Sequence, residues 1–200
     1  MEDNKPLAYR MRPRTLEEYV GQEHILGKDK ILYRTIKADR LSSIILFGPP
    51  GCGKTSLAKV ISETTKYKFE KINAVTSGVS DIKKIIEDAK NVFLNPTGKC
   101  ILFIDEIHRF NKLQQDALLP AVEDGTIILI GATTENPYFS VNKALISRSM
   151  VFKLEPLNEN DILKVLKMAL ERKDGLGEYN INISDNTLKN IAKISGGDVR

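Results

Sequence analysis

Two short stretches of the sequence carry residues that could do phosphate chemistry. The first, GPPGCGKT at 48–55, follows an apolar run and precedes a segment with helical apolar spacing. Glycines let successive backbone N–H groups curl around one anion, and the start of a helix adds its positive end. Lys54 is then placed to reach the β- and γ-phosphates of a nucleotide, and the Thr55 hydroxyl to bind Mg²⁺. The predicted phosphate loop comprises Gly48, Pro49, Pro50, Gly51, Cys52, Gly53, Lys54, Thr55 and Ser56.

The second stretch ends a buried strand in two adjacent acids, Asp105 and Glu106. A desolvated carboxylate is costly unless it has a partner, and a cation beside Thr55 would supply one. The spacing therefore predicts that Asp105 is a Walker B aspartate that binds magnesium through water. It also predicts that Glu106 orients and polarises the attacking water. The alternative is a pair of solvated acids at the end of a strand.

The elements that must position these residues alternate along the chain. Apolar or alternating runs predict strands at 43–48, 68–74, 99–105, 126–134 and 150–154. Helical spacing is found at 54–67, 78–94 and 111–124. This alternation predicts an α/β fold with a central five-stranded parallel sheet flanked by helices. Within 111–124, we expect Leu113, Ala117, Leu118 and Val122 to face the core and Pro120 to kink or shorten the helix.

The pattern changes near Pro156. Two helical segments, 159–173 and 184–195, follow with no strand between them. We therefore predict a nucleotide-binding α/β domain at 1–155 and the start of a small helical lid domain at 156–200. A third helix is expected to begin at the end of the sequence, which predicts that the chain is truncated.

The composition limits the class of protein. With 42% hydrophobic and 28% charged residues it is typical of a soluble globular chain. No apolar run reaches the roughly 20 residues of a membrane span, and the start lacks the apolar core of a secretory signal, which favours the cytoplasm and no membrane partner. Two cysteines are too few for a disulfide framework, and no metal-binding spacing is present.

Charge is uneven along the chain. Residues 1–100 carry 18 Lys and Arg against 12 Asp and Glu, whereas residues 101–200 carry 12 against 14. A basic half permits a nucleic-acid face without establishing one, because solvated lysines on helix surfaces give the same count.

Taken in order, GPPGCGKT, FIDEIHRFN, IGATTENP and ALISRSMVF resemble the AAA+ ATPases of the clamp-loader and RuvB-like branch. A closer resemblance, over essentially the whole chain, is to the replication-associated recombination protein A (RarA/MgsA) family. The residues that carry it are PLAYRMRPRTLEEYVGQEHILG, AVTSGV, DEIHRFNKLQQDALLPAVEDGTI, GATTENP and SGGDVR. The resemblance implies a P-loop AAA+ fold and a DNA-dependent ATPase, with ATP and Mg²⁺, that remodels DNA ends or stalled forks in replication, recombination and repair.

The resemblance also implies roles for single residues. Thr134, with Thr133 as the alternative, matches sensor 1 near the γ-phosphate, and Arg148 matches an arginine finger that acts on the neighbouring subunit's nucleotide. Arg200 matches sensor 2, while Arg12, Val20 and Gly21 would lie near the nucleotide and its adenine. The other possibilities are strand-end hydroxyls for the threonines and a surface residue that caps the preceding turn for Arg148.

The partners implied by the resemblance are DNA forks, ends and junctions, single-strand DNA-binding protein, and further copies of the chain in a homotetramer, in the nucleoid-associated cytoplasm. The family's C-terminal oligomerisation region is expected to be absent. Candidate DNA contacts are Thr76, Ser77, Lys83, Arg109, Asn111 and Lys112. A helix N-terminus there would bind backbone phosphate, although capping and surface roles would explain the same residues. His108 is expected to be structural or DNA-facing rather than a base.

Three other functions remain open or are disfavoured. A clamp-loader subunit or a Holliday-junction motor belongs to the same branch, but HRFNKLQQDA disfavours it. A nucleotide-binding module without turnover is the competing class, since Arg148 needs a neighbour. A kinase or GTPase lacks support, because no acceptor motif or Asn-Lys-x-Asp motif is present. Cys52 in the phosphate loop raises the hypothesis of sensitivity to oxidation.

Overall fold

A parallel sheet forms the centre of the computed structural model, which describes residues 5–91 and 93–199. Its strands are β1 (Ile44–Phe47), β2 (Lys68–Asn73), β3 (Cys100–Asp105), β4 (Ile127–Thr133) and β5 (Met150–Lys153). The five strands run in the order β2-β3-β4-β1-β5, and every pairing is parallel. The carboxyl ends of β1, β3 and β4 therefore lie at one edge, where the predicted site residues follow them.

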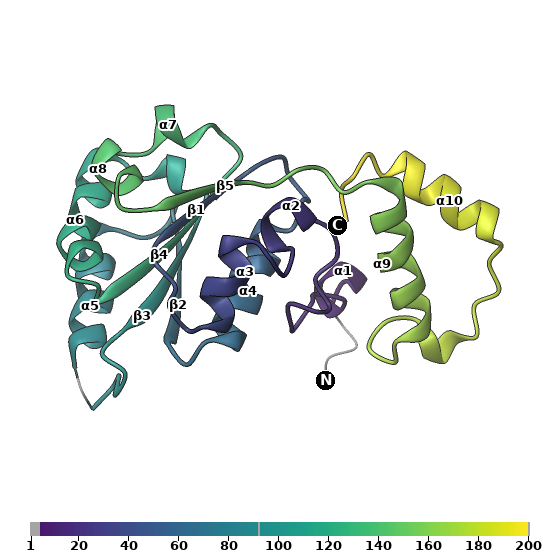
Figure 1. Cartoon of the computed structure of the whole chain (residues 1–200), viewed down its shortest axis with the longest axis horizontal. Helices are drawn as coiled ribbons and strands as arrows, with labels where there is room; N and C mark the ends of the chain where they lie inside the picture. Colours follow the sequence, from purple (N-terminus) through teal and green to yellow (C-terminus); the bar gives the residue numbers. More distant parts are fainter. Residues whose placement is uncertain (1–4, 92, 200) are drawn as a thin grey trace.

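Helices cover both faces of the sheet (Figure 1). One face carries α3 (Ile31–Lys37) and α4 (Lys54–Thr64), and the other carries α5 (Val79–Lys90), α6 (Lys112–Glu123) and α8 (Lys143–Ile146). Successive strand residues point to opposite faces, so Ile44 and Leu46 pack with the first pair and Ile45 with the second group. This two-sided burial explains why the central strands are almost continuously apolar.

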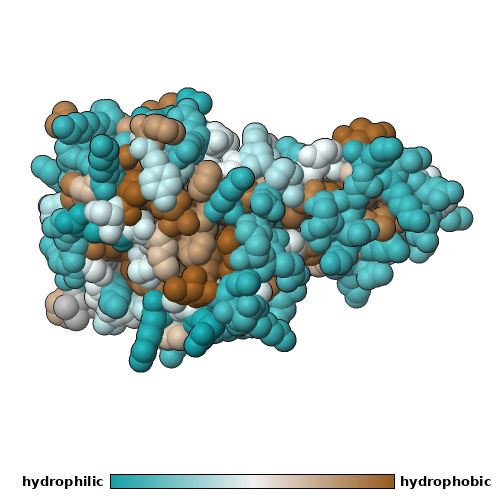
Figure 2. Space-filling model, turned by 45° about the horizontal axis from the view of Figure 1, so that its top comes forward, coloured by the Kyte–Doolittle hydropathy of each residue, from teal (hydrophilic) through white to brown (hydrophobic). Residues whose placement is uncertain are grey.

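The part of the chain that follows β5, here called the lid (residues 156–199), projects to one side of the sheet. Helix α1 (Leu7–Arg10) lies between the lid and α4 (Figure 1). The remaining elements are α1 (Leu7–Arg10), α2 (Glu23–Leu26), η1 (Ile107–Arg109), α7 (Pro137–Ser140), α9 (Glu159–Glu171), η2 (Gly177–Tyr179) and α10 (Asp185–Ile194). The lid has its own small core of Leu157, Ile162 and Ala192. On the face drawn in Figure 2, this part is mainly hydrophilic, with hydrophobic residues on its upper edge and near its centre.

The predicted five-stranded parallel sheet is confirmed, and several details of the predicted helices are wrong. The helix expected at 54–67 ends at Thr64, and the helix expected at 78–94 ends at Lys90. Leu113 does not face the core but is 73% exposed, because the buried face of α6 follows Gln114, Leu118 and Ala121, and position 113 lies to one side of it. Gln114 and Gln115 are buried there instead, and their amides donate to the Ser77 and Phe110 carbonyls. The helix is not shortened at Pro120, since α6 continues to Glu123.

The proposed division at 155/156 stays a prediction, and it falls in the segment between β5 and α9. Both cysteines are buried free thiols, as their number predicted. Within residues 5–91 and 93–199, no helix has the length and hydrophobicity needed to cross a bilayer.

Candidate nucleotide site

The phosphate loop joins β1 to α4 through backbone conformations that favour glycine. Gly51 and Gly53 have φ values of +73° and +101°. A Cβ on Gly53 would overlap the hydroxyl oxygen of Tyr19, and a Cβ on Gly51 would overlap the carboxylate of Asp198. Only glycine therefore lets the loop pass between the N-terminal segment and the lid without strain.

Lys54 is the first residue of α4, and its side chain lies inside the loop. The residue is only 8% exposed, and its Nζ donates to the carbonyls of Gly48 and Pro49, both at 2.8 Å. A buried ammonium needs such partners, and the loop backbone supplies them. Cys52 Sγ lies 3.8 Å from the same Nζ. Burial raises the pKa of the Cys52 thiol more than Lys54 lowers it, so the thiol stays protonated and its reactivity is reduced.

The two residues predicted to share a cation lie together. Thr55 Oγ1 is 3.3 Å from Asp105 Oδ2, which connects the start of α4 to the end of β3. Lys71 Nζ is 3.9 Å from the same carboxylate oxygen. A hydroxyl and a carboxylate fit Mg²⁺, which takes one or two protein oxygens and completes its shell with water and substrate phosphates. Among the described residues, no group of three or more His, Cys, Asp or Glu is placed to hold a metal ion.

Glu106 adopts a left-handed backbone conformation, with φ +57° and ψ +46°, at the start of η1. Its Oε2 is 3.2 Å from His108 Nε2 and 3.7 Å from Arg109 Nε. His108 Nδ1 in turn lies 2.8 Å from Thr133 Oγ1 on β4. This is an unfavourable backbone conformation for a non-glycine residue, and such conformations concentrate at functional sites.

A cavity opens beside the loop and these acids. The residues that line it are Pro6, Ala8, Tyr9, Arg12, Pro50, Gly51, Gly53, Lys54, Thr55, Ser56, Asp105, Glu106, Arg109, Thr134 and Val199. Thr133 is fully buried, with its hydroxyl bound to His108 and to the Glu135 backbone N–H. Of the two candidate threonines, it is therefore Thr134 that reaches the cavity.

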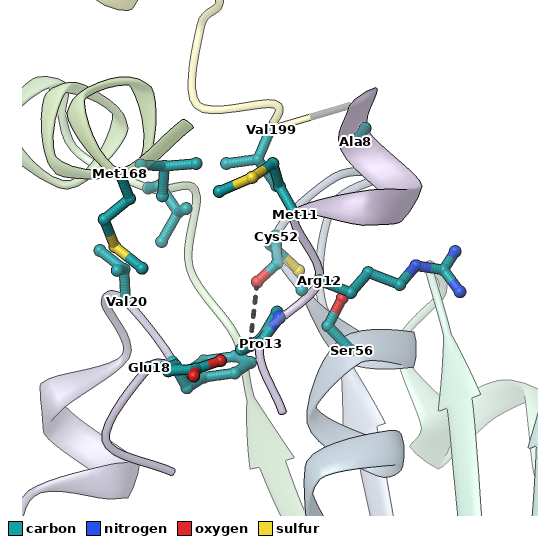
Figure 3. Close-up of a pocket in the computed structure, with 14 residues that line it drawn as sticks. Ala8, Met11, Arg12, Pro13, Glu18, Val20, Cys52, Ser56, Met168 and Val199 are labelled. Carbon is teal, nitrogen blue, oxygen red and sulfur yellow. Dashed lines mark hydrogen bonds between the residues drawn. The ribbon is translucent and has the colours of Figure 1, made fainter. Parts of the chain in front are cut away.

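A second, mainly apolar cavity adjoins the first (Figure 3). Its walls are Ala8, Met11, Arg12, Pro13, Glu18, Tyr19, Val20, Cys52, Gly53, Ser56, Leu157, Val165, Met168 and Val199. The two cavities share Ala8, Arg12, Gly53, Ser56 and Val199, so they form one groove with an apolar end and a phosphate-loop end. The chemistry suits an apolar, flat group at one end and phosphates at the other.

Several groove residues were predicted and others were missed. Val20 lines the apolar end beside Met168 of α9, as Figure 3 shows. Gly21 follows Val20 and lies against Leu157, which a Cβ on Gly21 would overlap. Arg12 lines both ends, and its guanidinium lies 4.7 Å from the Tyr9 ring centre.

Tyr19 and Gln22 are the main residues that sequence reasoning missed. The Tyr19 hydroxyl donates to the Cys52 carbonyl at 3.5 Å, and burial raises the pKa of Tyr19 far above its usual value. Gln22 is buried and exchanges two hydrogen bonds with the Glu155 backbone, at 2.7 and 3.0 Å. Both belong to the stretch YVGQ at 19–22, in which Val20 and Gly21 were predicted, but nothing local in the sequence distinguishes a buried tyrosine or glutamine from a surface one.

Arg148 lies outside this groove. It follows α8, on the side of the sheet away from the lid (Figure 1). Its guanidinium forms an ion pair with Glu123 at 2.6 Å and donates to the Ala144 carbonyl at 3.0 Å. It does not line the groove of its own chain. Arg200 lies outside the described residues.

The candidate DNA contacts gather around the N-termini of α5 and α6. Thr76, Lys83, Arg109 and Lys112 are exposed there, and Ser77 is partly exposed. The Asn111 side chain accepts from the Gln114 backbone N–H, which makes it the N-cap of α6. At the start of α5, the Asp81 carboxylate accepts from the Gly78 backbone N–H at 2.8 Å. The negative charge of Asp81 makes the N-terminus of α5 a weaker site for phosphate. This runs against the expectation that this N-terminus binds backbone phosphate.

Comparison with known proteins was consistent with this geometry. Residues 11–146 match the family described as the Holliday junction DNA helicase RuvB P-loop domain. The replication-associated recombination protein A of Escherichia coli K12 is 51% identical over 197 residues, which make up 98% of this chain and 44% of that protein. ATPase WRNIP1 of Dictyostelium discoideum is 48% identical over 195 residues, 98% of this chain and 22% of that protein.

Among solved structures, the Thermotoga maritima RuvB Holliday junction branch migration motor is 28% identical, with a TM-score of 0.77 over 96% of this chain and 62% of that one. The predicted P-loop AAA+ fold and the resemblance to the replication-associated recombination proteins are thereby confirmed. The chain spans less than half the length of the two curated relatives, at 44% and 22%.

Proposed function

The chain belongs to the family of the Holliday junction DNA helicase RuvB P-loop domain, and on this premise we propose that it is an ATPase of the replication-associated recombination protein A type. Hydrolysis would be coupled to the remodelling of DNA ends or stalled forks. The observation that carries the proposal is the 3.3 Å contact between Thr55 and Asp105, with Glu106 beside it at the groove. This contact supports a cation site at the phosphate-loop end of the groove, with Glu106 as the proposed base.

Each group has a defined task in hydrolysis. Lys54 would exchange the loop carbonyls for β- and γ-phosphate oxygens, so that its charge offsets the charge developing on them. Thr55 and Asp105 would hold Mg²⁺, which supplies further neutralisation of phosphate charge when bound. Glu106 would orient a water for attack on the γ-phosphorus and accept its proton as ADP leaves. Thr134 would hydrogen-bond the γ-phosphate, and Val20 and Met168 would enclose the purine.

The position of Arg148 supports action between copies of the chain. Since it lies away from its own groove, it is available to a nucleotide held by a neighbour, where a guanidinium stabilises transition-state charge. Full activity would then require a homo-oligomer, expected to be a tetramer.

DNA is the proposed macromolecular substrate, and single-strand DNA-binding protein the proposed partner. Thr76, Lys83, Arg109 and Lys112 are exposed at one end of the molecule, which supports contacts with the phosphate backbone rather than with bases. Such binding weakens steeply with added salt. A Holliday-junction motor is the nearest alternative within the family.

A nucleotide-binding module without turnover is the second candidate. The observation that favours it is the ion pair between Arg148 and Glu123 of the same chain, which holds the predicted finger on its own surface. In that case ATP would bind in the groove but would not be hydrolysed until another molecule supplied an arginine.

ATP turnover per chain, measured across protein concentrations with and without forked DNA, separates these proposals. Glu106→Gln serves as the blank, because it removes the base but keeps the side chain's size. A rate per chain that rises with concentration, and again with DNA, supports the ATPase acting between subunits. A rate equal to the blank at every concentration refutes turnover and leaves the binding module.

A further inference from the structure

His108 connects the end of β3 to the end of β4 through two hydrogen-bonding contacts. Its side chain is 10% exposed, so it is largely shielded from water. Nε2 faces Glu106 Oε2 at 3.2 Å, and Nδ1 faces Thr133 Oγ1 at 2.8 Å. Glu135 Oε1 lies farther from the same Nε2, at 3.7 Å. The imidazole thus lies between the carboxylate that would polarise water and the end of β4, which Thr134 follows.

The partners of the ring determine its tautomer. A carboxylate only accepts hydrogen bonds, so the nitrogen that faces Glu106 must carry hydrogen, which assigns an Nε2–H. Thr133 Oγ1 already accepts the Glu135 backbone N–H at 3.0 Å, and its own hydrogen is free to point at Nδ1. The chain of donors therefore runs from Thr133 through His108 to Glu106.

The backbone makes this support necessary. Glu106 is one of four non-glycine residues with positive φ in the described part of the chain. Its side chain is 38% exposed, so packing alone does not fix the position of the carboxylate. A carboxylate in that setting samples several rotamers unless a fixed donor selects one. Arg109 is a weaker restraint, because its Nε is 3.7 Å away and its side chain is 58% exposed.

We propose that His108 is a positioning residue for ATP hydrolysis: it holds the Glu106 carboxylate in one orientation and couples that orientation to the end of β4. This rests on the proposed function, since it assumes that Glu106 acts on the attacking water. His108 does not line either cavity of the groove, so it would act through Glu106. A shift of Thr134, which follows β4, would pass through Thr133 and the ring to Glu106, so the base would respond to what occupies the phosphate end of the groove.

The test compares two replacements of His108. His108→Leu removes both contacts, whereas His108→Gln keeps an amide N–H that can reach Glu106. Misplacing a catalytic group by about 1 Å lowers a rate on the order of 100-fold. We expect a fall in kcat of roughly 10- to 100-fold in His108→Leu, with partial recovery in His108→Gln and no change in ATP affinity in either. His24→Gln alters the other of the two histidines and is expected to keep the wild-type rate.

Nitrogen NMR of the two imidazoles gives a readout that does not depend on turnover. We expect the Nε2–H tautomer at His108, and we expect Glu106→Gln to shift the His108 nitrogens while leaving those of His24 unchanged. A merely structural His108 would lower kcat, ATP affinity and the unfolding temperature together, and would leave Gln no better than Leu.

Three results overturn the inference. The first is a wild-type kcat in His108→Leu when the wild-type chain shows turnover that depends on Glu106, which leaves the proposed function intact. The second is an Nδ1–H tautomer at His108, or nitrogen NMR signals of His108 that do not shift in Glu106→Gln. The third is no Glu106-dependent turnover in the wild-type chain at any concentration, which removes the proposed function and this inference with it.

Discussion

Replacing Gly53 by alanine should destabilise the chain by more than an ordinary glycine-to-alanine change at positive φ. The backbone there has φ +101°, and the left-handed region costs an alanine about 1–2 kcal/mol. The added Cβ would also overlap the Tyr19 hydroxyl and lie 3.1 Å from the ring carbon Cζ. Overpacking of this kind adds about 1–3 kcal/mol, so the expected total is about 2–5 kcal/mol.

A matched pair of variants separates the two contributions. Gly98 also has positive φ, at +66°, but a Cβ there would meet no atom within 4 Å, so Gly98→Ala should cost only the backbone term of about 1–2 kcal/mol. Tyr19→Phe removes the hydroxyl that Gly53→Ala would hit. In that background we expect the cost of Gly53→Ala to fall toward that of Gly98→Ala, with a residual cost because the Cβ would still lie 3.1 Å from the ring carbon Cζ.

Urea unfolding of the four variants gives the required free energies. The Tyr19 hydroxyl bond to Cys52 is long, at 3.5 Å, so Tyr19→Phe alone should cost less than a typical hydrogen bond, under about 1 kcal/mol. Equal losses in Gly53→Ala and Gly98→Ala, or a Gly53→Ala loss that Tyr19→Phe does not relieve, would show that the loop does not press on Tyr19 in solution.

Three further predictions concern other parts of the chain. Leu113→Lys should change the free energy of unfolding by less than about 0.5 kcal/mol, whereas Leu118→Ala should cost about 2–5 kcal/mol by chemical denaturation, because only Leu118 is buried. The hydrogen-bonded Arg172 lowers the pKa of Asp174, so its stabilisation is present above pH about 4 and lost as pH falls through the depressed folded-state pKa. Asp174→Asn should therefore reduce the acid dependence of the unfolding midpoint, and an unchanged acid limb would contradict this. Burial raises the pKa of Cys52, so iodoacetamide at pH 8 should label it more slowly in the folded chain than in urea, as mass spectrometry would show; equal rates would support the oxidation hypothesis instead.

The sequence was sufficient for the features that are local. The phosphate loop and the paired acids lie next to their strands in the chain, so the two motifs together predicted that Thr55 and Asp105 share a cation, and the two side chains lie 3.3 Å apart. Hydrophobic periodicity was less reliable on α6. It assigned Leu113 to the core because Leu113 and Ala117 are four residues apart, but the buried face follows Gln114 and Leu118, and a pattern of apolar residues does not include a buried glutamine.

The apolar end of the groove was only partly predictable, and solely through resemblance. Its walls come from Met11, Tyr19, Leu157 and Met168, which are separated by up to most of the chain and meet only after folding. None of them has the residue type or spacing of a binding motif. His108 was similarly ambiguous, since the stretch DEIHR does not reveal that the ring faces Thr133 on another strand.

The apolar end of the groove has walls on both sides of the short connection after Leu154. Val20 and Cys52 belong to the part of the chain before this connection, and Met168, on α9, belongs to the part after it. A molecule that fills the groove touches both, so its affinity depends on the angle between them. By thermodynamic reciprocity, any partner that fixes this angle must change nucleotide affinity by the same factor by which nucleotide changes affinity for that partner. We therefore expect that a substitution on the outer surface of the lid that alters partner binding also changes the affinity for nucleotide, although the substituted residue does not contact the nucleotide.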